Sequence, residues 1–483
     1  MIGQTVARWC LSPLKDFMNY HDIFKDKKIT LMGLGLLGRG VGDAIFLAEA
    51  GADLTVTDLK SEKDLAASIG PLKKFKNIKF VLGEHRLEDF QKVSATGGAD
   101  LVVKAAGVPM DSPFILEAEK NGVSVVMSTS LFAEYTPAQI VGITGTRGKS
   151  TVAYLLYEIL KEHNEKTGRN TFLGGNVLGV STLDLLPKTS NGDTAVLELD
   201  SWQLQGFGNS HHQEFPKNPE GFSPSVAVFT TFMVDHMNYY GGDMERYFAD
   251  KANVYRFQGP EDVLVVSEQV EKFIKKFGPE PKSKMIVARP TDVPNSWKIK
   301  IPGEHNRLNV ALAVRAAQAM SVPERTIESV VESFKAIPGR LELVRTYRGI
   351  DLYNDTNSTT PDATIVGLES LAKEKKLVLI FGGADKKLDQ KPLLKILPDY
   401  TKALIVLPGS GTDLIRPQLE KISEQNKGLP VIFVKNMNEA VSEALEQAKI
   451  GDKVLMSPAF ASFGLFKNEY DRGDQFNEAV NKL

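Results

Sequence analysis

Short apolar runs recur along most of the chain, separated by polar, glycine-rich turns and by segments with helical spacing of apolar residues. Strands that alternate with helices predict parallel sheets covered on both faces by helices. In the first quarter of the chain, the predicted strands are 28–33 (KITLMG), 54–58 (LTVTD), 101–107 (LVVKAAG) and 123–127 (VSVVM). We therefore expect an α/β domain over residues 27–129. It follows an extension, residues 1–26, in which we predict only a short helix near 13–20.

The same alternation continues to the end of the chain. A short link at about 128–140 is expected to lead into a central domain over residues 130–337, and Pro338-Gly339 is a plausible hinge before a third, Rossmann-like domain over 338–483. We predict central strands at 194–200, 225–231 and 261–267, a β segment between Pro290 and Pro302, and helices at 244–257, from near His305, and at 327–334. The predicted strands of the third domain are 350–354, 377–383, 403–409, 430–434 and 453–457.

The sequence GITGTRGKST joins an apolar strand to a helix through a glycine-rich turn. Backbone N–H groups at such a junction and the helix N-terminus create positive potential for phosphate oxygens. The spacing departs from G-x-x-x-x-G-K-[ST], because Ile143 stands at the first glycine position and Gly145 falls inside the loop. We nevertheless predict a triphosphate site. Its residues are Gly145, Thr146, Arg147, Gly148, Lys149, Ser150 and Thr151.

The turn GLGLLGRG places Gly33, Gly35 and Gly38 in a G-x-G-x-x-G arrangement, and Asp58 ends the next predicted strand. This pattern is typical of a Rossmann-like dinucleotide site. A nicotinamide oxidoreductase, a different nucleotide ligand and a purely structural turn all remain open, although no hydride-transfer site is evident nearby. A second nucleotide signal at 141–151 favours two phosphorylated ligands over one redox cofactor.

Composition narrows the class of protein. With 483 residues, a formal charge of −2, 42% hydrophobic and 24% charged residues, the chain is expected to form about three globular domains without a basic nucleic-acid surface. Cys10 is the single cysteine, so no intrachain disulfide is possible. No signal sequence and no apolar run long enough to span a bilayer is evident. We expect a cytoplasmic protein with no nucleic-acid partner and no membrane insertion.

Candidate chemical groups follow the predicted central strands. Glu198 and Asp200 end one strand, where carboxylates can hold Mg²⁺, and His236 follows the next in a polar segment. Lys251 is predicted in a helix with Tyr247 and Tyr255 on the same face, which would remove its ammonium partly from water and lower its pKa. A surface lysine with a packed stem is the alternative.

Further polar positions flank the proposed hinge. Asn306 and Asn309 lie one turn apart at the start of a helix, so they could bracket a base or a phosphate, or one of them could cap the helix. Arg340 follows the hinge, and Asp355 ends a strand of the third domain. Domain closure would bring both toward a nucleotide held by the central domain.

The chain resembles the Mur ligase family over nearly everything after residue 27, and most closely the D-glutamate-adding members. The resemblance is carried by GITGTRGKST, LELDSWQLQ, FMVDHMNYY, the lysine of FADKANVY, GEHNRLN, PGRLE, YNDTNSTTP, FGGADKK and SPAFASFGLFKNEYDRGDQF. It implies a three-domain, ATP-dependent amide ligase of peptidoglycan precursor synthesis, which we expect to be a monomer. ATP would phosphorylate the carboxylate of UDP-N-acetylmuramoyl-L-alanine, and the amine of glutamate would displace the phosphate through a tetrahedral intermediate.

The resemblance also implies roles for individual residues. Catalysis would rest on Lys149, Glu198, His236 and Lys251, with two Mg²⁺ ions held by Ser150, Glu198, His236 and a carbamylated Lys251. Further ATP contacts would be Asn306, Asn309, Arg340 and Asp355. The nucleotide substrate would meet Leu36, Leu37, Asp58, Asn176 and Gln203. The amino acid would meet Asn357, Thr359, Lys386, Ser462, Phe463 and Lys467.

Two positions depart from the family pattern. Asn357 stands where the D-glutamate-adding members often carry a lysine that pairs with the amino-acid carboxylate, and Asp200 stands where a serine is more usual. A neutral amide loses a charge-assisted contact of about 1–2 kcal/mol. D-glutamate is therefore the first expectation for the acceptor, and L-glutamate or another acidic amino acid the second. An NAD(P)-dependent oxidoreductase and a non-catalytic nucleotide sensor are the weaker alternatives.

Overall fold

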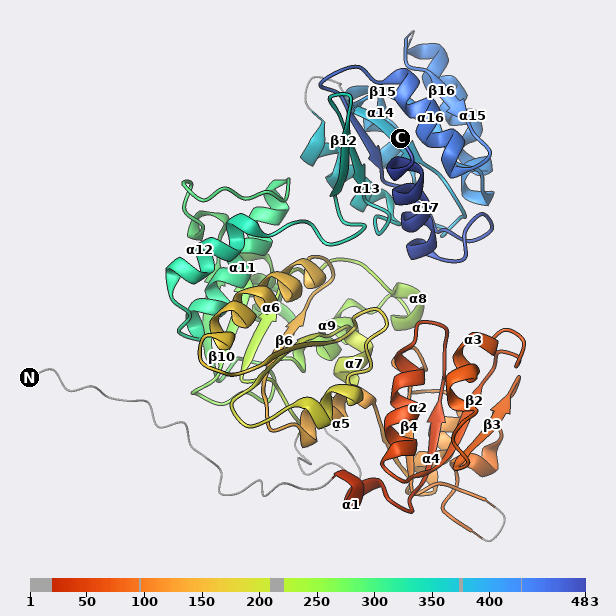
Figure 1. Cartoon of the computed structure of the whole chain (residues 1–483), viewed down its shortest axis with the longest axis vertical. Coiled ribbons are helices and arrows are strands. Elements are labelled where there is room, and N and C mark those ends of the chain that lie inside the picture. The colour runs from red at the N-terminus through yellow and green to blue at the C-terminus, as the bar shows by residue number, and fades with distance from the viewer. Residues whose placement is uncertain (1–19, 95–96, 209–220, 373–376, 427) are drawn as a thin grey trace, which may run out of the picture. The chain divides into compact units, whose positions relative to one another are not determined.

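The computed structural model describes residues 20–94, 97–208, 221–372, 377–426 and 428–483 (Figure 1). The chain divides into two compact units, the first made of residues 1–289 with 312–327 and the second of residues 290–311 with 328–483. The described residues form three sheets, two in the first unit and one in the second. This α/β architecture confirms the predicted fold class.

The first sheet is parallel, in the order β3-β2-β1-β4-β5. Its strands are β1 (Lys28–Met32), β2 (Asp53–Asp58), β3 (Ile78–Leu82), β4 (Leu101–Lys104) and β5 (Ser124–Val126). β1 pairs with both β2 and β4, so the connections after β1 and β4 diverge at the carboxyl edge of the sheet. Such a divergence opens the crevice in which α/β sheets bind ligands. The prediction missed β3, an edge strand.

The second sheet of the first unit is also parallel, in the order β11-β10-β9-β6-β8-β7. Its strands are β6 (Gln139–Thr144), β7 (Thr171–Gly175), β8 (Thr194–Glu198), β9 (Val226–Phe229), β10 (Val263–Ser267) and β11 (Lys284–Ala288). β6 lies between β8 and β9, and Ile143 pairs with both Glu198 and Val228. The candidate residues after these three strands therefore meet at one edge.

The sheet of the second unit has the order β12-β13-β17-β14-β15-β16. Its strands are β12 (Glu342–Tyr347), β13 (Ile350–Asn354), β14 (Leu377–Phe381), β15 (Thr401–Val406), β16 (Val431–Phe433) and β17 (Lys453–Met456). β12 is antiparallel to β13, whereas the other pairs are parallel.

Helices cover the three sheets. In the order of the chain they are α1 (Tyr20–Phe24), α2 (Arg39–Glu49), α3 (Ala66–Ile69), α4 (Pro113–Lys120), α5 (Ser128–Tyr135), α6 (Lys149–Glu165), α7 (Ser201–Gln205), α8 (Met237–Tyr240), α9 (Met244–Ala252), α10 (Glu268–Phe277), α11 (Glu304–Ala319) and α12 (Glu324–Ser333). The remaining helices, all in the second unit, are α13 (Pro361–Leu371), α14 (Lys391–Tyr400), α15 (Ser410–Gln425), α16 (Met437–Gln447) and α17 (Glu469–Asn481). Short 3₁₀ helices lie at Gly70–Leu72, Leu87–Phe90, Leu183–Lys188 and Pro290–Asp292.

Three local predictions differ from the structure. The predicted link at 128–140 contains helix α5. The β segment predicted between Pro290 and Pro302 is wrong, because this stretch contains a 3₁₀ helix and no strand, and proline cannot donate to a sheet ladder. The helix predicted over 244–257 ends at Ala252. Of the helix predicted near 13–20, residues 13–19 lie outside the described part of the chain.

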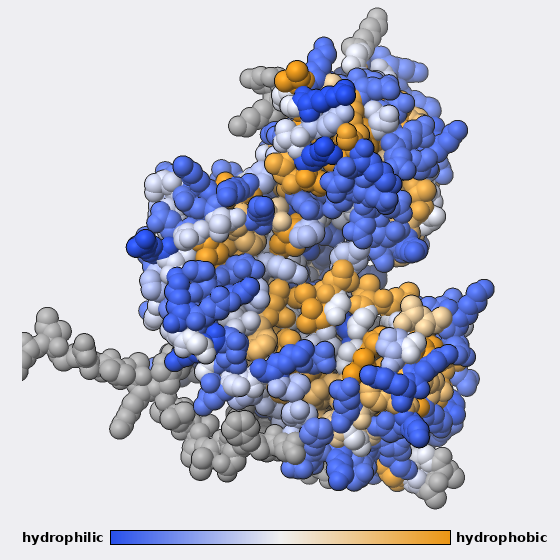
Figure 2. Space-filling view, viewed as in Figure 1, coloured by the Kyte–Doolittle hydropathy of each residue, from blue (hydrophilic) through white to orange (hydrophobic). Residues whose placement is uncertain are grey.

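A continuous hydrophobic cluster runs through both sheets of the first unit, from Leu31 and Val56 to Leu197 and Phe229. The second unit has its own clusters on the two faces of its sheet. Polar side chains cover most of the face shown in Figure 2. In the described part of the chain, no helix is both long enough and apolar enough to cross a membrane.

Candidate active site

The loop between β6 and α6 is held against the residues that follow β9. Gly145 has a φ angle of 145°, and a Cβ atom at this position would overlap the hydroxyl oxygen of Thr230. Thr146 donates its backbone N–H to Thr231 O at 2.7 Å. Gly148, with φ of 85°, caps the N-terminus of α6. The glycine at 145, which departs from the common phosphate-loop spacing, is therefore required by the close approach of the loop to its neighbour.

Two lysines meet at this loop. Lys149 Nζ lies 2.9 Å from Gly145 O and 3.1 Å from Thr146 O. Lys251 Nζ, from α9, lies 3.0 Å from the same Gly145 oxygen, although the two residues are 106 positions apart in the sequence. The fold thus brings two amines to a loop whose backbone geometry suits phosphate groups.

Lys251 is buried, with 2% of its surface exposed. Burial and then the charge of Lys149 hold the pKa of its amine well below the usual value, while nearby aspartates act in the opposite direction. Tyr247 contributes its ring, 5.0 Å from Lys251 Nζ, which confirms one of the two predicted neighbours. The prediction that Tyr255 lies on the same helix face is wrong, because α9 ends at Ala252.

The carboxylates after β8 have different local roles. Glu198 ends the strand and is buried. Asp200 caps α7 by accepting Gln203 N–H at 2.7 Å, and Asp200 N–H donates to Gln203 Oε1 at 3.2 Å. This reciprocal pair is a capping box, so Asp200 has a structural function that the sequence pattern D-x-x-Q also indicates.

His236 lies beside an ion pair that involves the phosphate loop. Asp235 binds Arg147 at 2.7 Å, and its carboxylate lies 3.8 Å from His236 Nε2. His236 has a left-handed backbone with φ of 55°, and its ring centroid is 4.9 Å from that of Trp202. Burial lowers the pKa of His236, and the carboxylate of Asp235 partly opposes this. The neutral imidazole is therefore favoured, which is the form that binds a metal.

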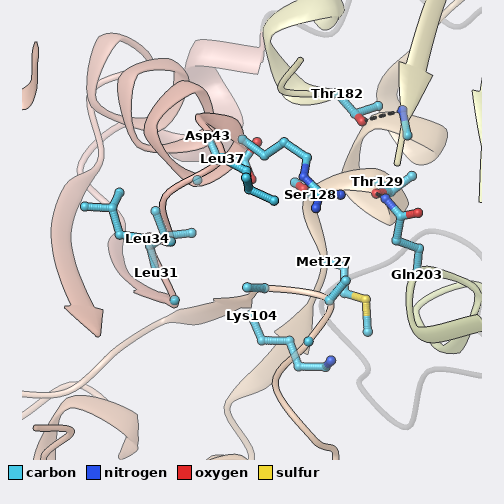
Figure 3. Close-up of a pocket in the computed structure, with 18 of the residues that line it drawn as sticks. Leu31, Leu34, Leu37, Asp43, Lys104, Met127, Ser128, Thr129, Thr182 and Gln203 are labelled. Atoms are coloured by element: carbon cyan, nitrogen blue, oxygen red, sulfur yellow. Dashed lines mark hydrogen bonds between the residues drawn. The ribbon is translucent and has the colours of Figure 1, made fainter. Parts of the chain in front are cut away.

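A cavity of about 200 Å³ lies at the carboxyl edge of the first sheet (Figure 3). It is lined by the turn after β1, the end of β4, the start of α5, and α7. Leu36, Leu37 and Gln203, which were predicted to contact a nucleotide substrate, are among the residues that line it. Arg39 and Lys104 also line it, although neither residue was predicted to belong to a site.

Asp58 and Asn176 do not line the cavity but form hydrogen bonds with residues that do. Asp58 accepts the backbone N–H of Gly35 at 3.0 Å and so fixes the glycine-rich turn. Asn176 accepts a hydrogen bond from Arg39 Nη1 at 2.7 Å. Both predicted residues therefore lie next to the cavity, through backbone or side-chain contacts with its lining.

Asp43 is a buried carboxyl group of α2 that was not predicted as a site residue. Ser181 Oγ donates to it at 2.6 Å, across 138 positions of sequence. Burial raises the pKa of Asp43 to about 6, although hydrogen bonds from Ser181 and Ser128 lower it in part. The group also lines the cavity.

In the second unit, the predicted ATP contacts fall at two places. Asn309 Nδ2 donates to Asn306 Oδ1 at 3.0 Å, and both side chains are buried at the start of α11. Asp355 accepts Ser457 Oγ at 2.8 Å, and burial raises its pKa to about 6. Arg340 is exposed.

The predicted amino-acid contacts lie on turns after β13, β14 and β17. Lys386 Nζ donates to Thr359 Oγ1 at 3.1 Å, which joins two of these turns. Asn357 Nδ2 lies 3.4 Å from Pro338 O. Ser462 is buried and Phe463 is 67% exposed. The remaining predicted contact, Lys467, is exposed.

Arg472 is fully buried and fixes two of these turns to each other. Its guanidinium donates to Thr356 Oγ1 at 3.1 Å, to Thr356 O at 2.9 Å and to Phe460 O at 3.1 Å. Burial lowers its pKa to about 10. A charged residue inside the run DRGDQF was the only signal in the sequence, and that signal does not reveal burial.

Two family models together match more than half of the chain. The Mur ligase middle domain matches residues 143–317, and the Mur ligase glutamate ligase domain matches residues 339–460. The UDP-N-acetylmuramoylalanine--D-glutamate ligase of Borreliella afzelii (strain PKo) is 35% identical, over 96% of this chain and 99% of its own length. The enzyme of the same name from Roseiflexus sp. (strain RS-1) is 33% identical, over 94% and 98%.

Solved structures share the fold at lower identity. UDP-N-acetylmuramate-alanine ligase from Thermotoga maritima is 18% identical, with a TM-score of 0.56 over 94% of this chain and 99% of the other. Mycobacterium tuberculosis folylpolyglutamate synthase, complexed with ADP, is 14% identical, with a TM-score of 0.52 over 73% and 93%.

Proposed function

Because the chain belongs to the Mur ligase family, we propose that it adds D-glutamate to UDP-N-acetylmuramoyl-L-alanine while ATP is converted to ADP and phosphate. As a member of this family it is an ATP-dependent amide ligase of peptidoglycan synthesis. The proposed substrates follow from the relatives, which cover the chain almost completely. The proposed setting is the cytoplasm, with the protein acting as a monomer.

One observation carries the proposal. The glycine-rich turn after β1 and helix α7 line the same cavity, and α7 begins three residues after Glu198, at the end of the strand that pairs with β6. A nucleotide bound on the turn would therefore extend toward the edge where the phosphate loop lies. An oxidoreductase has no use for a second phosphate site of this kind.

The chemistry explains the residues of the loop. A carboxylate is a poor electrophile until one of its oxygens becomes a good leaving group, which phosphorylation by ATP provides. Lys149 supplies positive charge for the phosphates, together with the backbone N–H groups at the start of α6. The amine of glutamate then attacks the acyl phosphate carbon, an amide bond forms, and phosphate leaves.

Two of the proposed metal ligands have the chemistry that Mg²⁺ needs. Ser150 and Glu198 are buried oxygen donors, and neither side chain has a hydrogen bond within the described part of the chain. Oxygen is the ligand that Mg²⁺ prefers, and the bound ion would supply charge neutralisation for the transferred phosphoryl group. Among the residues that the structure describes, no cluster of three or more His, Cys, Asp or Glu side chains is arranged for a metal. A complete site therefore needs other donors.

Carbamylation of Lys251 would supply such a donor. A neutral amine adds to CO₂ with loss of one proton, which forms an anionic carbamate with two oxygen atoms. Burial favours the neutral amine of Lys251 and so favours this reaction. His236, whose neutral form is also favoured, is the proposed ligand of a second ion.

The second unit would supply the remaining contacts. Asn306, Asn309, Arg340 and Asp355 are proposed to bind ATP. Asn357, Thr359, Lys386, Ser462, Phe463 and Lys467 are proposed to bind the amino acid. The Lys386 ammonium, held at Thr359, offers the amino-acid carboxylate the charge that Asn357 lacks. L-glutamate is the alternative acceptor.

Phosphate release tests the proposal. With ATP and Mg²⁺ present, release should require both UDP-N-acetylmuramoyl-L-alanine and D-glutamate, and omission of either should reduce the rate to background. ATP hydrolysis at an equal rate without them would show that the chain is not this ligase. Saturable binding of NAD(P)H, followed by cofactor fluorescence, would instead support an oxidoreductase.

A further inference from the structure

Lys104 is a buried cation in the wall of the nucleotide cavity. It is the last residue of β4, pairs with Met32 of β1, and is 2% exposed. In Figure 3 its side chain runs from the end of β4 toward the side of the cavity where Met127 and Gln203 are drawn. The other residues of β4 are apolar, and an apolar residue at this position would be buried at no cost. A fully buried lysine is rare unless its charge is paired, so its presence here suggests a function.

The contacts of Lys104 do not neutralise its charge. Its Nζ donates one hydrogen bond, to Val108 O at 2.9 Å. Among the residues that the structure describes, no carboxylate lies within 4.0 Å of this amine. An ammonium has three N–H donors, and a buried charge is costly unless it is paired. Burial accordingly lowers the pKa of Lys104 to about 8. An anionic ligand would restore the favourable pairing.

The cavity contains a second cation, and the two lie on different elements. Arg39 is the first residue of α2, directly after the glycine-rich turn, where backbone N–H groups favour phosphate. Lys104 lies on β4 instead, and the carboxylates that act on it at longer range are Asp200, which caps α7, and Asp250 of α9. The proposed nucleotide substrate has two kinds of anionic group, the diphosphate and the alanyl carboxylate. The turn suits the diphosphate, which leaves the carboxylate for Lys104.

We propose that Lys104 binds the alanyl carboxylate of the nucleotide substrate and positions it for phosphorylation. This inference rests on the proposed function. The contact would orient one carboxylate oxygen. A ligand without the carboxylate would bind more weakly, because it could not make this contact. Lys104 is thereby a determinant of specificity for substrates with an acyl group to activate.

Equilibrium binding without ATP tests this inference. UDP-N-acetylmuramoyl-L-alanine is titrated against UDP-N-acetylglucosamine, which has the same diphosphate and no carboxylate. Lys104→Met should weaken binding of the first ligand about 10-fold to 100-fold and leave the second within about 2-fold. Lys104→Arg should restore part of the affinity, because the charge is kept. In turnover, Lys104→Met should raise the KM for the nucleotide substrate and leave the KM for ATP unchanged.

A matched control is Lys79→Met, the same substitution at an exposed position of β3 in the same sheet. It should change neither affinity. Equal weakening of both ligands by Lys104→Met would overturn the inference, since Lys104 would then serve the diphosphate or the fold. Unchanged affinity for both would overturn it as well. If the wild-type protein binds UDP-N-acetylglucosamine and not the alanyl ligand, the proposed function itself fails.

Discussion

Lys149 and Lys251 donate hydrogen bonds to one and the same oxygen atom, the carbonyl of Gly145, at 2.9 Å and 3.0 Å. Burial and the nearby positive charge of Lys149 both disfavour the charged form of Lys251, so the pKa of its amine lies well below the usual value. Lys251 is the more buried of the two lysines. This relationship makes Lys251 chemically distinct from the surface lysines of the chain.

Activity should depend on CO₂ through Lys251. In buffer depleted of CO₂, the ligation rate should fall and bicarbonate should restore it, because the neutral amine forms a carbamate reversibly. A ¹³CO₂-labelled sample should show one carbamate carbon by NMR that is absent from Lys251→Ala. Lys272→Ala, at a lysine of α10, is the control and should keep both the signal and the activity. A wild-type rate that is indifferent to CO₂ would remove carbamylation from the mechanism.

Lys149→Ala should lower kcat by about 100-fold or more and weaken ATP binding, because it removes a cation from the phosphate loop. The measurement is the initial rate of phosphate release against ATP concentration. Lys161→Ala lies further along the same helix and should leave both constants nearly unchanged. Equal effects of the two substitutions would contradict a specific role for the loop lysine.

Asp43 should make the first unit less stable as pH rises. Its pKa is about 6 in the folded chain against an ordinary value of 3.8. The folded state binds the proton more tightly, so stability is greatest below the unfolded pKa and is lost as pH rises through the folded one. The free energy of unfolding of wild type, relative to Asp43→Asn, should fall by roughly 2 kcal/mol between pH 4 and pH 7. Urea unfolding at several pH values checks this.

The control for that experiment is Asp53→Asn, which removes one carboxylate from an exposed position at the start of β2. Its difference from wild type should show much less change over the same pH range. A pH-independent difference between wild type and Asp43→Asn would contradict the assignment.

Arg472→Met should destabilise the second unit by about 2–4 kcal/mol, because Thr356 O and Phe460 O would lose their buried donors. Arg416→Met, at an exposed arginine stacked on Phe433, should cost less than about 1 kcal/mol. Hydrogen exchange in α17 and denaturant unfolding report the difference. Because the turn of Ser462 and Phe463 follows Phe460, the KM for glutamate should also rise in Arg472→Met.

Much of the sheet structure was predictable because parallel strands buried on both faces are continuous apolar runs, as in β14 and β15. Strand β11 was missed although it contains the apolar run MIVA, whereas two other missed strands, β12 and β7, lack this signal. β12, with the sequence ELVRTY, is an antiparallel edge strand that is only partly buried, and β7 ends in two glycines. The β segment predicted near Pro290 is the opposite error, because a strand was predicted where none forms. The prolines in this stretch lack the backbone N–H groups that a strand needs for pairing.

The candidate site was predictable where a residue type follows a strand or fills a known spacing. Glu198, Lys149 and Asp58 are of this kind. Lys104 and Asp43 were not, because each is a single charged residue in an otherwise ordinary strand or helix. Only the folded chain shows that both residues are buried at a cavity. There they interact with residues that are far away in the sequence, as Asp43 does with Ser181.

Addition of D-glutamate is tested most directly by the mass and stoichiometry of the product formed with D-glutamate and with L-glutamate. With UDP-N-acetylmuramoyl-L-alanine, ATP and D-glutamate, we expect one amide product, one ADP and one phosphate for each glutamate consumed. L-glutamate should give little product under the same conditions. ADP formed without an amide product, or equal or faster ligation of L-glutamate, would show that the chain is not a D-glutamate-adding ligase.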